Sequence, residues 1–135
     1  MKAVDGLITL PSSFGTKETM DRLAGEIASH DLEVFARIDH AAGAAEAGLK
    51  LRPTMLILFG NPRGGTPLME AAQTAGIDLP LKALVWDDAA GKTWLSYNEP
   101  AWIARRHGAP DAAVGVNKLS AMLTMLCRKA TTAFD

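Results

Sequence analysis

The sequence predicts an α+β fold, a single-domain two-layer α/β sandwich in which a mixed sheet of about five strands carries helices mainly on one face. Three observations predict this class. The chain has 135 residues, which fits one domain of ordinary size spanning residues 1–135. Apolar residues make up 48% and charged residues 21%, so a hydrophobic core can form. Short apolar runs typical of strands alternate along the chain with stretches of helical periodicity.

The N-terminal third alternates between predicted strands and helices. Leu7–Leu10 is a short predicted strand, and Leu32–Asp39 alternates apolar and polar residues as a half-buried strand does. Between them, Thr16–His30 is expected to be a helix with its threonine hydroxyl as the cap and an apolar face at helical spacing. The alanine-rich stretch Ala41–Ala47 predicts a short helix that Gly48 can end in the left-handed conformation.

The chain is organised around Thr54–Pro67. Its five consecutive apolar residues, Met55–Phe59, predict a strand buried on both faces. The next residues, Asn61–Thr66, are expected to form a glycine-rich loop that leads into a helix over about Pro67–Ala75. Because a rigid sheet commonly presents functional residues on such loops, this loop is the first candidate for a site.

The C-terminal half adds a hairpin and two helices. Leu81–Asp87 and Lys92–Tyr97 predict two strands joined by a tight glycine-containing turn. Asn98 is a natural cap for a helix that lasts to His107. A final amphipathic helix is expected over about Val116–Thr132.

Charge and composition argue against several functional classes. A net charge of −1 and a pI near 6.3 give no electrostatic basis for binding nucleic acid. The N-terminus lacks the apolar core of a secretory signal, and no apolar run approaches the roughly 20 residues needed to cross a bilayer. We therefore expect a cytoplasmic protein with no nucleic-acid partner and no membrane association.

The side chains that could bind a metal are scattered along the sequence. His30, His40, His107, Cys127 and Met69 include no CxxC, HxxxH or HExxH spacing, so we expect no metal ion and no cofactor. The single cysteine cannot form an internal disulfide, which suits a reducing compartment, and it is expected to be a small core residue.

The glycine-rich loop is a candidate anion site. Successive N–H groups around Gly64 and Gly65, next to a helix N-terminus, can converge on an anion, and Asn61 can help to orient it. Arg63 can add a bidentate contact to a carboxylate or a phosphate. The spacing matches neither GxxxxGK[ST] nor GxGxxG. The alternative is that the glycines only turn the chain and that Arg63 is solvated.

Asp39 and His40 close a predicted strand and form a second candidate. A carboxylate beside an imidazole can act as a general acid–base pair, or His40 could bind a metal. Adjacent strand residues point to opposite faces, however, so Asp39 is poorly placed to orient His40. The alternative is structural, with His40 capping the helix that begins near Ala41 and Asp39 bonding loop amides.

Tyr97 and Asn98 end another predicted strand. Tyr97 could reach over a pocket, and Asn98 could bond a ligand. The alternative is that Asn98 only caps the next helix, with Glu99 favourably placed against the helix dipole.

Three functions follow from these candidates. The leading one is the binding of an anionic metabolite in a pocket where the strands Leu32–Asp39, Thr54–Gly60 and Lys92–Tyr97 end. The second is an enzyme at the same place, with His40 as general acid or base and Arg63 stabilising charge. The third is a structural or interaction domain with no small ligand. The predicted site residues are Asp39, His40, Asn61, Arg63, Gly64, Gly65, Tyr97 and Asn98.

The tryptophans suggest a partner. Trp86 and Trp94 fall in the predicted hairpin, where one face is expected to be core and the other can be covered by another molecule. Together with the amphipathic C-terminal helix, they make a homodimer a hypothesis to be tested.

A set of short motifs resembles the bacterial and archaeal domain of unknown function 302 family. The motifs are Phe35–His40, Ala45, Gly48–Leu49, Arg52–Thr54, Phe59–Pro62, Gly65–Met69, Leu79–Leu81, Val85–Trp86 and Ser96–Asn98. The resemblance covers roughly Leu7–Gly108 and leaves the C-terminal helix, about Val116–Thr132, outside the recognised motifs. It implies a compact α/β domain, often a whole protein by itself, and no established activity, substrate or cofactor. Where the family usually has a lysine-type residue in its Asn-Pro-x-Gly loop, this chain has Arg63, which keeps the charge.

Overall fold

The computed structural model describes residues 1–110 and 115–133, and in it five strands form one antiparallel sheet. The strands are β1 (Leu7–Pro11), β2 (Glu33–Asp39), β3 (Thr54–Gly60), β4 (Leu81–Asp87) and β5 (Thr93–Asn98). They lie in the order β1-β5-β4-β3-β2, and every neighbouring pair is antiparallel. The α+β class and the strand number are thus confirmed, but the expected mixed sheet is wrong. The first helix links strands at opposite edges of the sheet, so it does not make two neighbouring strands parallel.

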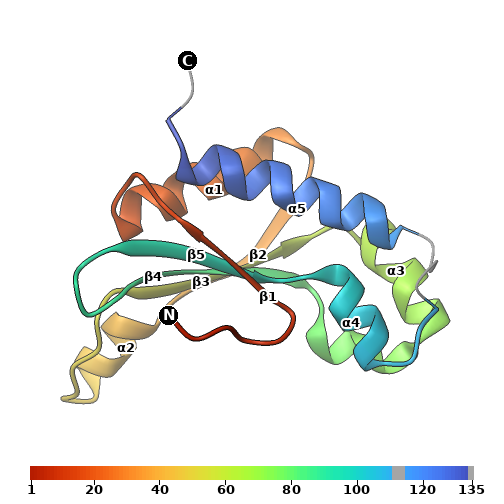
Figure 1. The fold of residues 1–135 in the computed structure, drawn as a ribbon, viewed down its shortest axis with the longest axis horizontal. Helices are drawn as coiled ribbons and strands as arrows, with labels where there is room; N and C mark the ends of the chain where they lie inside the picture. The colour runs from red at the N-terminus through yellow and green to blue at the C-terminus, as the bar shows by residue number, and fades with distance from the viewer. Residues whose placement is uncertain (111–114, 134–135) are drawn as a thin grey trace.

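The helices cover one face and the two ends of the sheet. They are α1 (Thr16–Ser29), α2 (His40–Glu46), α3 (Pro62–Ala71), the 3₁₀ helix η1 (Gln73–Asp78), α4 (Pro100–Arg106) and α5 (Val116–Thr131). Figure 1 shows α1 and α5 side by side over one face, as expected. It also shows α3 and α4 at one end of the sheet and α2 at the other end.

The main core lies between the sheet and the α1–α5 layer. The apolar face predicted for the first helix is fully buried, because Met20, Leu23 and Ile27 each have 0% exposure. These side chains meet alternate residues of the central strands, such as Ile57 and Val85, which point to the helix side. A smaller apolar cluster joins α3, η1, α4 and the start of α5 at one end of the sheet; its buried members are Leu68, Ala75, Ile103, Ala104, Ala109 and Val116.

The helix that follows β3 begins earlier than predicted. Asn61 is the N-cap of α3 and Pro62 is its first residue, so the stretch expected to be a glycine-rich loop forms the first turns of the helix. Asn-Pro is a strong start signal, since the asparagine side chain accepts a backbone bond and proline has the helical φ. Pro67, expected to start the helix, lies inside it.

Two other predicted caps are wrong. Gly15, not Thr16, precedes the first turn of α1, and the Thr16 hydroxyl instead donates a hydrogen bond to the Asp87 carboxylate at 2.6 Å. Asn98 is the last residue of β5, and the cap position of α4 is Glu99, which makes no side-chain capping bond. In both places the strand or helix extends one residue further than the local signal indicates.

Candidate functional site

A cleft of about 930 Å³ lies at the end of the sheet where β3 finishes. Because β2 and β4 both run antiparallel to β3, this is also the end where those two strands begin. The first turns of α3 and of α5 form the other side of the cleft. Gly64 of α3 lies against Leu119 of α5, since a Cβ atom at Gly64 would lie 3.1 Å from a methyl group of Leu119. The topology thus brings segments distant in sequence to one cavity.

Two cationic side chains, Arg63 and Lys118, and the imidazole of His30 line this cleft. All three residues are exposed to solvent, so they belong to the rim of the cleft. Among the described residues that line the cleft, none is an aspartate or a glutamate. The rim therefore favours an anion electrostatically.

The positions of the two cations, Arg63 and Lys118, conflict with the charge preferences of the helix ends on which they lie. Arg63 lies in the first turn of α3, and Lys118 lies in the first turn of α5. The N-terminus of a helix carries partial positive charge, so a cation is unfavourable there and an acidic residue is favourable. Neither first turn contains an acidic residue. Departures of this kind from local rules are expected at functional sites.

Most of the inner wall of the cleft is apolar. The apolar lining includes Leu32, which precedes β2, Leu58 from β3 and Met122 from α5, and also Phe35 of β2, which is 49% exposed and so lies nearer the rim. The register between β2 and β3 shifts between Val34 and Ala36, so Phe35 is the extra residue of a bulge. Bulges re-aim side chains and are common beside sites. Sequence alternation alone placed Phe35 as an ordinary strand residue and missed this role.

The backbone donors expected to bind an anion are occupied within the helix start. Asn61 accepts all of them: the N–H of Arg63 donates to its side chain at 2.9 Å, and the N–H groups of Gly64 and Gly65 donate to its carbonyl oxygen at 2.9 and 3.3 Å. The hypothesis that these N–H groups cradle an anion is therefore wrong, because the segment is helical and capped. Only side chains of this segment are available to a ligand.

Asp39 and His40 lie at the opposite end of the sheet from the cleft. Asp39 pairs with Met55 at the start of β3, and about 17 Å of strand, at roughly 3.3 Å per residue, separates Met55 from Gly60. The Asp39 carboxylate accepts a bond from the Ala42 N–H at 2.8 Å and caps α2, while His40 is the first residue of that helix. The expectation that His40 and Arg63 share one rim is wrong, because β2 and β3, the strands that these residues follow, are antiparallel and end at opposite ends of the sheet.

Tyr97 and Asn98 also lie outside the cleft. Tyr97 is only 6% exposed and points into the helix layer, where its hydroxyl lies 3.4 Å from that of Thr124 in α5. Burial raises the pKa of the Tyr97 phenol above its ordinary value. Asn98 is paired with Leu7 of β1. Of the predicted site residues, the structure brings together Asn61, Arg63, Gly64 and Gly65.

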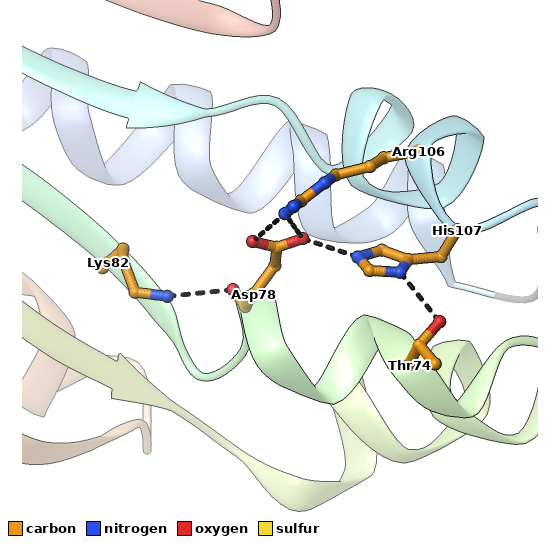
Figure 2. Close-up of polar contacts among 5 residues, drawn as sticks. All are labelled: Thr74, Asp78, Lys82, Arg106 and His107. Atoms are coloured by element: carbon orange, nitrogen blue, oxygen red, sulfur yellow. Dashed lines mark hydrogen bonds and ion pairs between the residues drawn. The ribbon is translucent and has the colours of Figure 1, made fainter.

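A cluster of polar side chains that the sequence did not indicate holds η1 against α4 (Figure 2). One Arg106 nitrogen donates to both carboxylate oxygens of Asp78, at 2.8 and 2.7 Å. His107 Nε2 lies 2.6 Å from the same carboxylate, and its Nδ1 lies 2.9 Å from the Thr74 hydroxyl. Lys82 donates to the Asp78 carbonyl oxygen at 3.0 Å. No spacing in the sequence links His107 to Asp78.

This Asp78 cluster fixes the ionisation of its carboxylate. Burial by itself would raise the pKa of Asp78, but hydrogen bonds from His107 and Arg106 outweigh burial and hold that pKa below its usual value. Burial lowers the pKa of Lys82, and the nearby Asp78 charge partly opposes this. Because η1 continues directly into Leu79, which lines the cleft, the cluster also positions one cleft wall.

Comparison with known proteins places this chain in a family. The family described as "Domain of unknown function DUF302" matches residues 8–126. The chain belongs to the DUF302 family. The match runs into α5, so the family region extends beyond the part of the sequence that resembles it by motif. A crystal structure of an uncharacterized conserved DUF302 protein from Bacillus stearothermophilus superposes with a TM-score of 0.83 at 19% identity, covering 94% of this chain and 99% of that one. It shows that the fold is shared.

The DUF302 chain is also similar to part of some longer proteins. It is 53% identical over 102 residues to fluoride-specific ion channel FluC 1 of Brucella suis biovar 1 and to FluC 1 of Brucella abortus biovar 1. The match covers 76% of this chain but only 40% and 38% of those two proteins. Their name thus describes whole proteins most of whose length lies outside the match. Within the described part of this chain, no helix has the length and apolar character needed to cross a membrane.

Proposed function

We propose that this DUF302 domain is a small-molecule binding module whose cleft holds an anionic metabolite. The observation that carries the proposal is the rim: His30, Arg63 and Lys118 line a cleft of about 930 Å³, and its described lining contains no carboxylate. The volume lies within the range of about 300–1,000 Å³ that is typical of small-molecule sites.

The two helix-borne cations are the groups that would contact the anion. A guanidinium such as that of Arg63 can bind a carboxylate or phosphate through two parallel hydrogen bonds, whereas Lys118 offers a point charge. An anion between them would also face the N-termini of α3 and α5, so it would relieve the unfavourable placement of both cations. In this proposal the side chains, and not the loop N–H groups, neutralise the ligand.

An enzyme that uses His40 is not supported, because His40 lies at the other end of β3 from the cleft. A structural or interaction domain without a small ligand is the competing interpretation. The two differ in one observable, which is whether any anion stabilises the native protein through Arg63.

A thermal-shift screen tests the proposal. The native protein would be heated with inorganic phosphate, dicarboxylates, nucleotides and aliphatic or aromatic carboxylates, beside the variants Arg63→Ala, Lys118→Ala and Lys50→Ala. Lys50 is exposed and follows α2 at the other end of the sheet, so it is the matched control. A ligand at 100 times its Kd adds about 2.7 kcal/mol, which raises the Tm by roughly 8 °C.

The expected result is a shift that Lys50→Ala retains and that Arg63→Ala and Lys118→Ala reduce. If no anion shifts the Tm, or if the double variant of Arg63 and Lys118 responds as the native protein does, the binding proposal is wrong. The interpretation as a domain without a small ligand would then be preferred.

We further propose that the sheet face opposite α1 and α5 binds a second copy of the chain. Trp86 and Trp94 stack on that face with ring centroids 6.3 Å apart, and both remain partly exposed. A partly exposed aromatic pair of this kind is more typical of an interface than of a solvated surface, because aromatic residues are enriched at interfaces. Light scattering would give about twice the 14.3 kDa of one chain, whereas a monomer at micromolar concentration would contradict this proposal.

A further inference from the structure

We infer that the ligand of the cleft is an amphiphilic anion, a carboxylate attached to an aliphatic or aromatic body, and not a compact polar anion. This inference rests on the proposed function and adds the chemical class of the ligand. It follows from how charge and apolar surface are distributed within the cleft, and from a glycine that opens its inner part.

The interior of the cleft offers a ligand mainly hydrocarbon and sulfur. Leu32, Leu58, Met69, Leu79 and Met122 line it, and they come from five separate segments of the chain. Flexible methionines allow such a wall to adapt to ligands of different shape. A compact anion such as phosphate would leave this surface uncovered, whereas the apolar body of an amphiphile would bury it.

Uncharged polar groups that could bind a polar ligand body are few. Among the described lining residues, the uncharged polar side chains are those of Asn61 and Thr66. The Asn61 side-chain oxygen already accepts the N–H of Arg63, because it caps α3. A sugar or a nucleoside needs several such partners, since its buried hydroxyl and amide groups are costly when unpaired.

Charge and hydrocarbon are separated along the depth of the cleft. Arg63 and Lys118 are exposed at the rim, where the 49% exposed Phe35 is also found, whereas the lining residues Leu81 and Leu119 are 6% and 8% exposed. An amphiphile presents the same order, with its carboxylate toward solvent and its body toward the protein. The rim can therefore neutralise the head group while the interior buries the body.

Gly65 provides a direct way to fill the cleft. A Cβ atom at Gly65 would lie 3.5 Å from Leu79 Cδ1 and 3.8 Å from Met69 Cε, which is ordinary contact, and both of those residues line the cleft. A leucine at this position would extend into the apolar interior. Gly25 in α1 is also helical, has nothing within 4 Å of its Cβ position and is exposed, so Gly25→Leu is the matched control.

The experiment measures Kd by titration calorimetry for straight-chain carboxylates from butanoate to decanoate, for primary alcohols of the same lengths, and for phosphate and citrate. We expect the affinity for carboxylates to rise roughly fourfold per added methylene group. Each alcohol should bind more weakly than its carboxylate, and the variants Arg63→Ala and Lys118→Ala should reduce that difference. Gly65→Leu should weaken decanoate binding at least tenfold, while Gly25→Leu should leave it unchanged.

The outcomes separate this inference from the proposed function. If phosphate or citrate binds as tightly as decanoate and depends on Arg63, the amphiphile class is wrong and the anion-binding module stands. If no anion binds, both are wrong. If decanol binds as tightly as decanoate, the anionic head group is not recognised and the inference is overturned. Should Gly65→Leu lose its native circular dichroism spectrum, Met122→Phe fills the same cleft from α5 and takes its place.

Discussion

The Asp78 cluster predicts a large effect from a change of one atom. Asp78→Asn keeps the size and shape of the side chain but removes its charge and one of its two carboxylate acceptors. In the native protein that carboxylate binds Arg106 and His107 together (Figure 2). After the change, the amide oxygen can take the place of Oδ2 and accept from both donors, but it is uncharged, and the amide NH₂ group then faces the Arg106 nitrogen in place of Oδ1.

The expected magnitude follows from the exposure of each partner. The Arg106 side chain is 49% exposed, so its ion pair contributes little, below about 1 kcal/mol. The side chains of His107 and Asp78 are only 9% and 15% exposed, and a hydrogen bond to a charged group in such a place is worth about 1.5–3 kcal/mol. We therefore expect Asp78→Asn to lower the free energy of unfolding by about 2 kcal/mol at pH 7, chiefly through His107.

Urea unfolding followed by tryptophan fluorescence measures this loss as a lower midpoint with an unchanged m-value. The matched control is Asp21→Asn, since Asp21 also has two cationic partners, Lys17 at 2.8 Å and Arg37 at 3.0 Å. Asp21 lies at the surface, so its replacement should leave the midpoint within error of the native value. Equal losses for the two variants would refute the reasoning that burial decides the strength of these contacts.

The same variant has a defined pH dependence. The pKa of Asp78 is lower in the folded protein than its ordinary value of 3.8, so its contribution to stability is complete above that value. The contribution is lost as the pH falls through the folded pKa, because the native carboxylate then becomes protonated. The difference in unfolding free energy between native protein and Asp78→Asn should therefore shrink as the pH falls below 3.8.

Three further predictions concern positions outside the cleft. Gly6 and Gly108 have nearly equal φ values of 76° and 75°. A Cβ atom at Gly6 would overlap the Trp102 ring, whereas a Cβ atom at Gly108 would have no neighbouring atom within 4 Å. In urea unfolding, Gly108→Ala should therefore lower the free energy of unfolding by about 1–2 kcal/mol, and Gly6→Ala should lower it by about 1–3 kcal/mol more. Equal losses for the two variants would contradict the predicted clash with Trp102. Burial raises the pKa of the Cys127 thiol to about 12, so a disulfide reagent at pH 8 should label the unfolded chain but not the native one; rapid native labelling would show that the thiol is accessible. Asp39→Ala should lower the free energy of unfolding by about 1 kcal/mol, because it removes the cap of α2. It should leave the Kd of every ligand of the cleft unchanged. A higher Kd would show that Asp39 contributes to the site.

Local signals in the sequence were sufficient for most of the elements. Alternation and helical spacing located the strands and the long helices to within a residue or two, because those patterns reflect which side chains face the core. The predicted start of α3 is wrong because Gly64 and Gly65 indicate a loop, whereas the preceding Asn61-Pro62 pair already starts the helix. Strand order could not be derived, since pairing joins residues far apart in the chain and no local pattern encodes it.

The missing strand order is also why the predicted site residues lie at two different ends of the sheet. Placing His40 beside the arginine of α3 required neighbouring strands to end at the same edge, and antiparallel pairing puts their ends apart. The sequence does contain one signal for the cleft. Lys118 lies in the first turn of a predicted helix that has no acidic residue in that turn, where the helix dipole disfavours a cation. Asp78 had no such signal, because its partners lie 28 and 29 residues away.

The contact between Gly64 of α3 and Leu119 of α5 has a consequence for the proposed ligand-binding cleft. With a neighbour 3.1 Å from the position of a Cβ atom, even a single methyl group there would force Leu119 aside or move the two helices apart. Gly64 and Leu119 both line the cleft, so a side chain at position 64 would change its walls without removing Arg63 or Lys118. If the proposed binding is correct, substitutions at Gly64 should change the size of ligand that binds, and substitutions at the two cations should change the ligand charge that is preferred.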